Sequence, residues 1–267
     1  MIDARFEVLV KLPWYTEGPA ADSLGNIFFT TLQGKVILKI DSKGKISEWV
    51  KANCPNGQII LPNDEHLICD SGEKSISRYD KQGKFIRYDV KEHCGDEIVS
   101  SPNDLVCDGY GGIYFTDSLR EHGKVFYCKP GGTETVIARN LDFPNGIAMS
   151  QDGNTLFVAE SYQNRILSFD IKHGYRQKIF AALPTHTSGK LTDNLPDGLK
   201  IDADDNLWVA HYGMGSVHVL SSQGKLINTI KVDLPLTSNL FLTEETIFVT
   251  GGYNEPGPGG LLQLAKS

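Results

Sequence analysis

Short apolar segments alternate with turns rich in Gly, Asp and Asn along almost the whole chain. In residues 25–40 (GNIFFTTLQGKVILKI), two apolar segments flank a polar turn, and residues 154–170 follow the same pattern. Apolar segments of this kind, bounded by turn residues, predict the strands of antiparallel sheets. Sustained helical periodicity is absent from the sequence, which disfavours an α/β architecture.

The strand pattern is itself repeated. Each copy contains an inner apolar strand, an Asp-x-x-Gly-type turn, a β-branched or aromatic strand, a polar loop and two more strands. The copies begin near Glu17, Asn56, Ser101, Phe143, Pro196 and Ser238. The last copy is one strand short, and residues 5–12 (RFEVLVKL) have no copy of their own.

The repeat predicts how the sheets pack. A four-stranded sheet alone leaves both faces uncovered, whereas radial stacking buries them and leaves only short edges. We therefore expect one domain over residues 1–267, an all-β, six-bladed β-propeller with four antiparallel strands per blade, closed by the N-terminal strand. A sandwich or solenoid built from the same repeat is the alternative.

Composition narrows the class of protein. The chain is 40% hydrophobic and 22% charged, with a net charge of −7 from scattered acidic residues. This balance argues against nucleic-acid and anionic-membrane partners. The sequence has neither a membrane-length apolar run nor a recognisable signal peptide, so a cytoplasmic location is expected. Five cysteines without a CxxC motif are expected to be reduced and mostly buried: Cys54, Cys69, Cys94, Cys107 and Cys128.

Polar residues occupy equivalent positions where four inner strands begin. They are Glu17, Asn103, Asn145 and Asp197. Inner strands start at the central channel of a propeller, so these oxygen-bearing side chains would converge and would need a partner. A hard divalent cation satisfies such a set. The alternative is that each residue only caps a turn.

Loops between the second and third strands share the channel face. Asp117, Glu121 and His211 lie in these loops and are candidates for binding substrate hydroxyls or moving a proton. They could also be ordinary polar groups at the rim. The segment 184–195 approaches Asp197 and could be a lid or a mobile loop. No Gly-x-Ser-x-Gly motif indicates a serine nucleophile.

Three phrases carry a family resemblance that extends over essentially the whole chain. They are SPNDLVCD (101–108), FPNGIAMSQDGNTLFVAES (143–161) and PDGLKIDADDNLWVA (196–210). With them, the chain resembles the senescence-marker-protein, gluconolactonase and luciferin-regenerating-enzyme family. The resemblance implies one bound divalent metal ion. Ca²⁺ is favoured, and Zn²⁺, Mn²⁺ and Mg²⁺ are the alternatives. Its implied ligands are Glu17, Asn145 and Asp197, with Asn103 binding either the metal or the water and substrate beside it.

The resemblance also implies a reaction. Asp197 corresponds to the favoured general base, and the metal-dependent opening of a small-molecule lactone is the implied activity. Substrate contacts would fall on Ser101, Asn103 and Glu121. Ser101 departs from family members that bind sugar lactones through an arginine at this position. A monomer or a small homo-oligomer is expected.

Three other functions fit the same features. One is a propeller esterase or phosphotriesterase, since metal activation serves many electrophiles. Another is a non-catalytic propeller that binds a metabolite around a structural metal. A third is a strictosidine-synthase-like condensing enzyme, although such enzymes do not keep this metal set.

Overall fold

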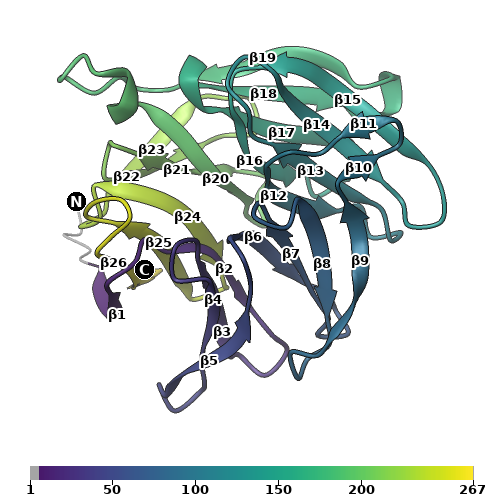
Figure 1. The fold of residues 1–267 in the computed structure, drawn as a ribbon. Helices are drawn as coiled ribbons and strands as arrows, with labels where there is room; N and C mark the ends of the chain where they lie inside the picture. The colour runs from purple at the N-terminus through teal and green to yellow at the C-terminus, as the bar shows by residue number, and fades with distance from the viewer. Residues whose placement is uncertain (1–5, 267) are drawn as a thin grey trace.

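The computed structural model describes residues 6–266, which form an all-β, propeller-like fold (Figure 1). The only helices over this range are three 3₁₀ turns, η1 (Ser161–Gln163), η2 (Ile171–His173) and η3 (Leu191–Asp193). None of them is long and apolar enough to cross a membrane. The expected all-β, propeller-like architecture is confirmed.

Three of the sheets contain four consecutive antiparallel strands each. The first comprises β2 (Glu17–Ala21), β3 (Ile27–Thr31), β4 (Val36–Ile40) and β5 (Ile46–Lys51). Another comprises β12 (Pro102–Cys107), β13 (Ile113–Asp117), β14 (Gly123–Cys128) and β15 (Glu134–Leu141). The next along the chain comprises β16 (Pro144–Met149), β17 (Thr155–Glu160), β18 (Arg165–Asp170) and β19 (Arg176–Ala182).

A six-stranded sheet adds a small hairpin to the same unit. Its main strands are β6 (Pro55–Ile60), β7 (His66–Asp70), β8 (Ser75–Tyr79) and β9 (Phe85–Lys91). The hairpin consists of β10 (His93–Cys94) and β11 (Glu97–Ile98), and β10 pairs with the end of β9. This hairpin leads directly into β12 of the neighbouring sheet.

The remaining strands form one eight-stranded sheet. Its first part comprises β20 (Leu195–Ile201), β21 (Leu207–Tyr212), β22 (Ser216–Leu220) and β23 (Leu226–Lys231). Its second part comprises β24 (Leu236–Leu242), β25 (Thr246–Gly252), β26 (Gly259–Ala265) and β1 (Glu7–Leu12). The parts join through a single β21–β24 pair, Tyr212 with Leu236. In the second part, β1 pairs antiparallel with β26 from the other end of the chain.

The first strands of these units lie nearest the middle of the molecule (Figure 1). They contact one another in the closed order β2, β6, β12, β16, β20, β24 and back to β2. Their residues are mostly buried, whereas the outer strands β5, β9, β19 and β23 are mostly exposed. The arrangement brings the start of each inner strand to a common centre.

Apolar side chains fill the space between adjacent sheets. Phe115 and Phe126 stack with ring centroids 5.0 Å apart in the largest cluster, which joins the β6–β11 sheet to the β12–β15 sheet. Between the β2–β5 and β6–β11 sheets, His66 packs with its ring centroid 4.0 Å from that of Trp49 and 4.6 Å from that of Phe28. Both His66 ring nitrogens are buried and have no hydrogen-bond partner within residues 6–266.

Candidate metal and substrate site

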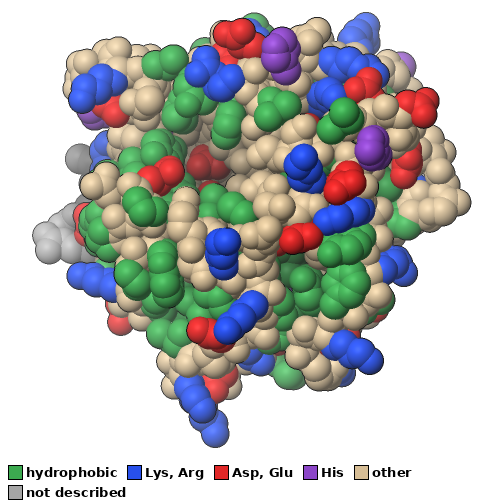
Figure 2. All heavy atoms as spheres, viewed as in Figure 1, with side chains coloured by type: hydrophobic (Ala, Val, Ile, Leu, Met, Phe, Trp, Pro, Cys, Tyr) green, Lys and Arg blue, Asp and Glu red, His purple; other side chains and the backbone are tan. Residues whose placement is uncertain are grey.

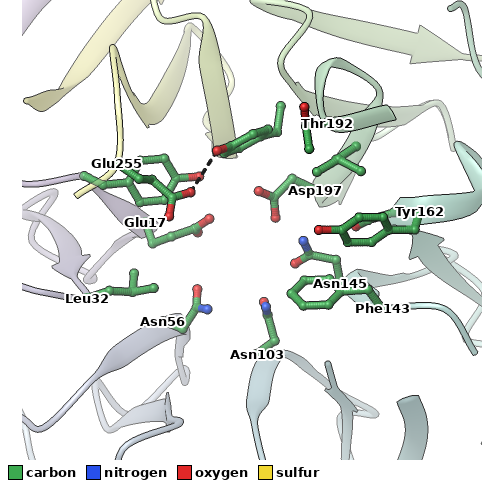
Figure 3. A pocket seen from close by; sticks show the side chains of 14 residues that line it. Glu17, Leu32, Asn56, Asn103, Phe143, Asn145, Tyr162, Thr192, Asp197 and Glu255 are labelled. Atoms are coloured by element: carbon green, nitrogen blue, oxygen red, sulfur yellow. Dashed lines mark hydrogen bonds between the residues drawn. The ribbon is translucent and has the colours of Figure 1, made fainter. Parts of the chain in front are cut away.

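A cavity of about 360 Å³ opens at the centre of the ring of inner strands (Figure 3). Its size is within the range of small-molecule sites. Figure 2 shows the surface hollowed near the middle of this face, with acidic side chains in the hollow. The lining residues come from several sheets: Tyr15, Glu17, Leu32, Asn56, Asn103, Phe143, Asn145, Ser161, Tyr162, Thr192, Leu195, Asp197, Tyr212 and Glu255.

Carboxylate and amide side chains project into this cavity from five inner strands. Figure 3 shows Glu17, Asp197 and Asn145 directed toward a shared space, with Asn56 and Asn103 directed into it from other strands. The four residues predicted from the start of the repeats, Glu17, Asn103, Asn145 and Asp197, are thus brought together. The structure adds Asn56, which is not among the residues predicted from the sequence.

An interruption in the strand register, near the start of every inner strand, accompanies this convergence. The ladder to the second strand is interrupted between Glu17 and Ala20 in β2, and between Pro144 and Ile147 in β16. The corresponding interruptions occur in β6, β12, β20 and β24. A bulge bends a strand and re-aims a side chain, here toward the cavity.

The residue after the cavity-facing position lies against the next inner strand. A Cβ on Gly146 would lie 2.1 Å from the backbone oxygen of Asp197, and one on Gly18 would lie 2.4 Å from that of Asn56. Second strands add hydrogen bonds to these contacts, since the Thr116 hydroxyl donates to the Asn145 carbonyl at 2.7 Å. Glycine is required where backbones approach this closely, so the ring is held tightly around the cavity.

Burial changes the acidity of the cavity carboxyls. It raises the pKa of Glu17 to about 7, although the Gly18 N–H donates to the carboxylate at 2.9 Å. Burial, followed by the charge of Glu17, raises the pKa of Asp197 well above its usual value. Burial also raises the pKa of Asp104, which follows Asn103. Several buried carboxyls cannot all be ionised here without a compensating positive charge.

Two amide oxygens beside these carboxyls lack donors. Asn56 Oδ1 and Asn145 Oδ1 are buried and accept no hydrogen bond from any described residue. Unsatisfied buried acceptors are costly and uncommon in native proteins. Oxygen donors from carboxylates and amides are the ligands of hard cations such as Ca²⁺. The side chains present therefore fit a divalent cation.

Aromatic and apolar side chains form much of the remaining wall. Tyr162 contacts Phe143 edge to face, and the Arg120 guanidinium, which is not part of the lining, lies 3.6 Å from the Tyr162 ring centroid. Tyr212 donates a hydrogen bond to Glu255 at 2.9 Å (Figure 3). Of the described residues that line the cavity, none is Lys or Arg. The wall therefore combines apolar surface with negative charge.

The other predicted substrate residues lie outside the lining set. Ser101 is only half-buried, and Glu121 is exposed at the surface. Asp117 is fully buried, where its Oδ1 accepts the backbone N–H of Ser100 at 3.0 Å and that of Ser101. Asp70 binds the backbone N–H groups of Asn53 and Cys54 in the same way. These acids hold the loops that enter the inner strands, which does not support a substrate-binding role for Asp117.

His211 is also outside the set of residues that line the cavity. It is fully buried, and its Nδ1 lies 3.0 Å from His218 Nε2, which in turn neighbours Thr229 through Nδ1. Burial, followed by the neighbouring His218, lowers the pKa of His211 to about 3. This environment suits a neutral structural histidine, and it does not support the expected contact with substrate.

The segment 184–195 forms one part of the rim. Thr192, which lies within η3, and Leu195 both line the cavity. The Ser188 hydroxyl donates to Asp193 at 2.6 Å, and the Asn194 amide donates to the Lys190 carbonyl at 2.7 Å. The segment is therefore built around its own hydrogen bonds.

Together, the fold and the cavity define an all-β, propeller-like protein with an oxygen-lined central site. The chain belongs to the SMP-30/gluconolactonase/LRE-like family, whose model matches residues 15–252. It is 34% identical over 271 aligned residues to lactonase drp35 of Staphylococcus aureus, covering 93% of this chain and 82% of that protein.

Solved structures agree with this assignment. A gluconolactonase from Xanthomonas campestris aligns with a TM-score of 0.84 and 25% identity, covering 99% of this chain and 91% of that one. The structure of regucalcin from Agrobacterium tumefaciens, described as a calcium-binding protein, aligns with a TM-score of 0.80 and 19% identity over 98% and 93% of the two chains. At this level of identity, the similarity to regucalcin shows a shared fold only.

Proposed function

We propose that this protein is a metal-dependent lactonase. The observation that carries the proposal is the convergence of Glu17, Asn145 and Asp197, with Asn56 and Asn103 beside them, on one cavity. Membership of a family with gluconolactonases and the similarity to a staphylococcal lactonase support lactones as the substrate class.

The proposed scaffold is a single six-bladed propeller over residues 1–267. The closed ring of contacts among β2, β6, β12, β16, β20 and β24 supports six blades, with the eight-stranded sheet counted as two. The pairing of β1 with β26 supports closure of the last blade by the N-terminal strand. Closure of this kind would lock the cavity-facing residues at fixed separations.

The proposed ligands of the metal are Glu17, Asn145 and Asp197, with Asn103 and Asn56 as further oxygen donors. An all-oxygen set favours Ca²⁺, while Mn²⁺, Mg²⁺ and Zn²⁺ are alternatives to be compared directly. When bound, such an ion polarises a carbonyl and lowers the pKa of water. Glu17 is oriented for this role by the Gly18 N–H and by the Asn239 amide, which donates to it at 3.2 Å.

The chain's own residues supply the rest of the proposed chemistry. Asp197 takes the proton from the attacking water, and Asn103 and Asn56 donate hydrogen bonds that orient the lactone. Phe143 and Tyr162 pack against the apolar part of the substrate and exclude water. The absence of Lys and Arg from the described lining, with Glu255 at its edge, favours lactones that carry no anionic group.

The test is a hydrolysis assay on metal-stripped and reloaded protein. We expect neutral γ- and δ-lactones to be opened, the activity to be lost with a chelator, and the reloaded ion to restore it. Carboxylated lactones of the same ring size should react more slowly. Full activity in excess chelator would contradict the metal requirement.

The same assay separates the alternatives. Faster turnover of aryl esters or phosphotriesters than of any lactone would favour an esterase or phosphotriesterase. Metal binding without turnover of any of these compounds would favour a non-catalytic metabolite-binding protein.

A further inference from the structure

A second cluster of possible ligands lies between two sheets, outside the central cavity. It contains Cys94 in β10, Cys128 at the end of β14 and Glu134 at the start of β15. One ligand atom from each, two Sγ atoms and a carboxylate oxygen, lie within 4.8 Å of one another. Both cysteines are buried free thiols, and Glu134 is exposed to solvent.

The strand register fixes two of the three ligands. Cys128 and Glu134 are directly paired in the β14–β15 ladder, and the Cys128 Sγ lies 3.8 Å from Glu134 Oε1. Ligands at ordinary Zn–S and Zn–O distances around a tetrahedral ion are separated by about 3.6 Å for a sulfur–oxygen pair and about 3.8 Å for two sulfurs. The separation of Cys128 and Glu134 is thus already close to that of a ligand pair.

The hairpin supplies the third ligand and orients the carboxylate. Cys94 comes from the β10–β11 hairpin, and the next residue, Gly95, donates its backbone N–H to Glu134 Oε2. A backbone hydrogen bond to the second oxygen of a carboxylate holds the first oxygen in position for a metal. Because Glu134 is exposed, the carboxylate of the cluster is accessible to an ion from solvent.

The chemistry of these ligands differs from that of the central cavity. Two sulfurs and one carboxylate are a set for a thiophilic cation such as Zn²⁺, whereas the cavity offers only oxygens and suits a hard cation. We propose that Cys94, Cys128 and Glu134 form a second metal site for Zn²⁺ or a similarly thiophilic divalent cation, with water as the fourth ligand. Binding releases one proton from each thiol, and both sulfurs ligate as thiolates.

The site would connect two neighbouring sheets. The β10–β11 hairpin belongs to the β6–β11 sheet, whereas Cys128 and Glu134 belong to the β12–β15 sheet. The same hairpin leads through the fully buried Val99 into Ser101 and Asn103. A metal at this position would therefore fix the entry of the chain into β12, and with it the cavity residue Asn103.

Co²⁺ titration of the purified 267-residue chain under reducing conditions tests the proposal. Thiolate ligation gives a charge-transfer absorption band, which the all-oxygen cavity site cannot produce. We expect one equivalent of the band in the wild-type chain and in Glu17→Gln, which alters only the cavity. The band should be absent in Cys128→Ser and persist in the control Cys107→Ser, since Cys107 lies outside the cluster.

Glu134→Gln keeps the test decisive if Cys128→Ser does not fold. Its side chain is exposed, so the fold should be retained while Co²⁺ affinity falls about 10-fold or more. Zn²⁺ should displace Co²⁺ from the cysteine site and abolish the band. Zn²⁺ should also raise the melting temperature of Glu17→Gln, in which only the cavity is altered. A missing band in the reduced wild-type chain, or a disulfide between Cys94 and Cys128 that forms in preference to metal binding, would overturn the proposal. None of these measurements depends on lactone hydrolysis.

Discussion

Asp197 is buried in the wall of the cavity, close to the carboxyl group of Glu17. Its pKa is raised by burial and then by Glu17, so its charged form depends on a compensating cation. A carboxylate in this setting can both bind the metal and accept a proton from water. The residue is therefore the most sensitive position for the proposed reaction.

Asp197→Asn should lower lactone kcat/KM by about 10²–10⁴-fold because the base is removed. The amide is nearly the same size, so the fold and its melting temperature should change little. Asp233→Asn, at an exposed carboxylate, is the matched control and should keep full activity. Near-wild-type turnover in Asp197→Asn would refute the assignment of the base.

Glu17→Gln should act first on metal affinity. The substitution removes one negative ligand but preserves an oxygen for the Gly18 N–H, so we expect affinity to fall by at least about 10-fold. Calorimetric titration with Ca²⁺ measures the effect, with the exposed Glu7→Gln as control. Unchanged affinity would exclude Glu17 as a ligand.

The buried His66 side chain should make the folded protein less stable in acid. Burial lowers its pKa from 6.5 to about 4, so the unfolded chain binds a proton that the folded chain excludes. The free energy of unfolding is therefore highest above pH 6.5, where His66 is neutral in both states. It falls by about 3 kcal/mol as the pH is lowered from 6.5 toward 4. Urea unfolding of His66→Phe should show a shallower pH dependence over this window. The exposed His122→Phe should retain the wild-type slope.

The sequence predicts individual site residues best where the copies of the repeat can be aligned with one another. Glu17, Asn103, Asn145 and Asp197 were identified because each begins an inner strand, and Asn56 begins one too, in a Pro-Asn-Gly phrase like that of Asn145. That parallel could have identified Asn56. Glu255 follows β25 in a loop that has no counterpart in other repeats, so no alignment pointed to it.

At the scale of elements, the sequence predicted strands and turns but not the bulges. The direction of a loop side chain depends on local backbone geometry that residue type alone does not specify. The sequence predicts that Asp117 and His211 lie in loops between the second and third strands, on the face of the channel. In the structure, Asp117 instead binds backbone N–H groups, and His211 pairs with His218.

The inner strands depend on glycine at their closest approach. Gly146→Ala should lower the free energy of unfolding by about 1–3 kcal/mol, because its Cβ would meet the backbone of Asp197 and Gly198, which cannot move independently. The displaced Asp197 should also weaken Ca²⁺ binding. Denaturant unfolding against Gly132→Ala, at a turn with more space, measures the difference. Equal stability of the two variants would argue against tight packing of the ring.

At the scale of the whole molecule, β1 joins the beginning of the chain to its end. Phe6 and Val10 are buried in clusters with β25 and β26 residues. Deleting residues 1–12 should destabilise the protein by at least about 3 kcal/mol, since both side chains are lost from the core. The exposed edge of β26 should also promote self-association. Scattering and thermal unfolding should detect both effects.

The control for this deletion keeps β1 and replaces only its exposed Val8 with Thr. It should melt close to the wild-type temperature and remain as soluble. If the deletion variant were equally stable, β1 would be dispensable for closure. The repeat predicts that residues 5–12 complete the last copy, which lacks one strand, and the pairing of β1 with β26 supports that prediction.

The β1–β26 ladder, with Glu7 opposite Gln263, also means that the two ends of the described chain are neighbours. A short linker could join them, and new ends could be opened at the exposed turn around Tyr110. Such a circular permutant would keep every strand pair, with β26 joined covalently to β1 and the connection between β12 and β13 opened instead. The place where the chain begins and ends would then differ between the two proteins, while the folded arrangement of strands would be the same.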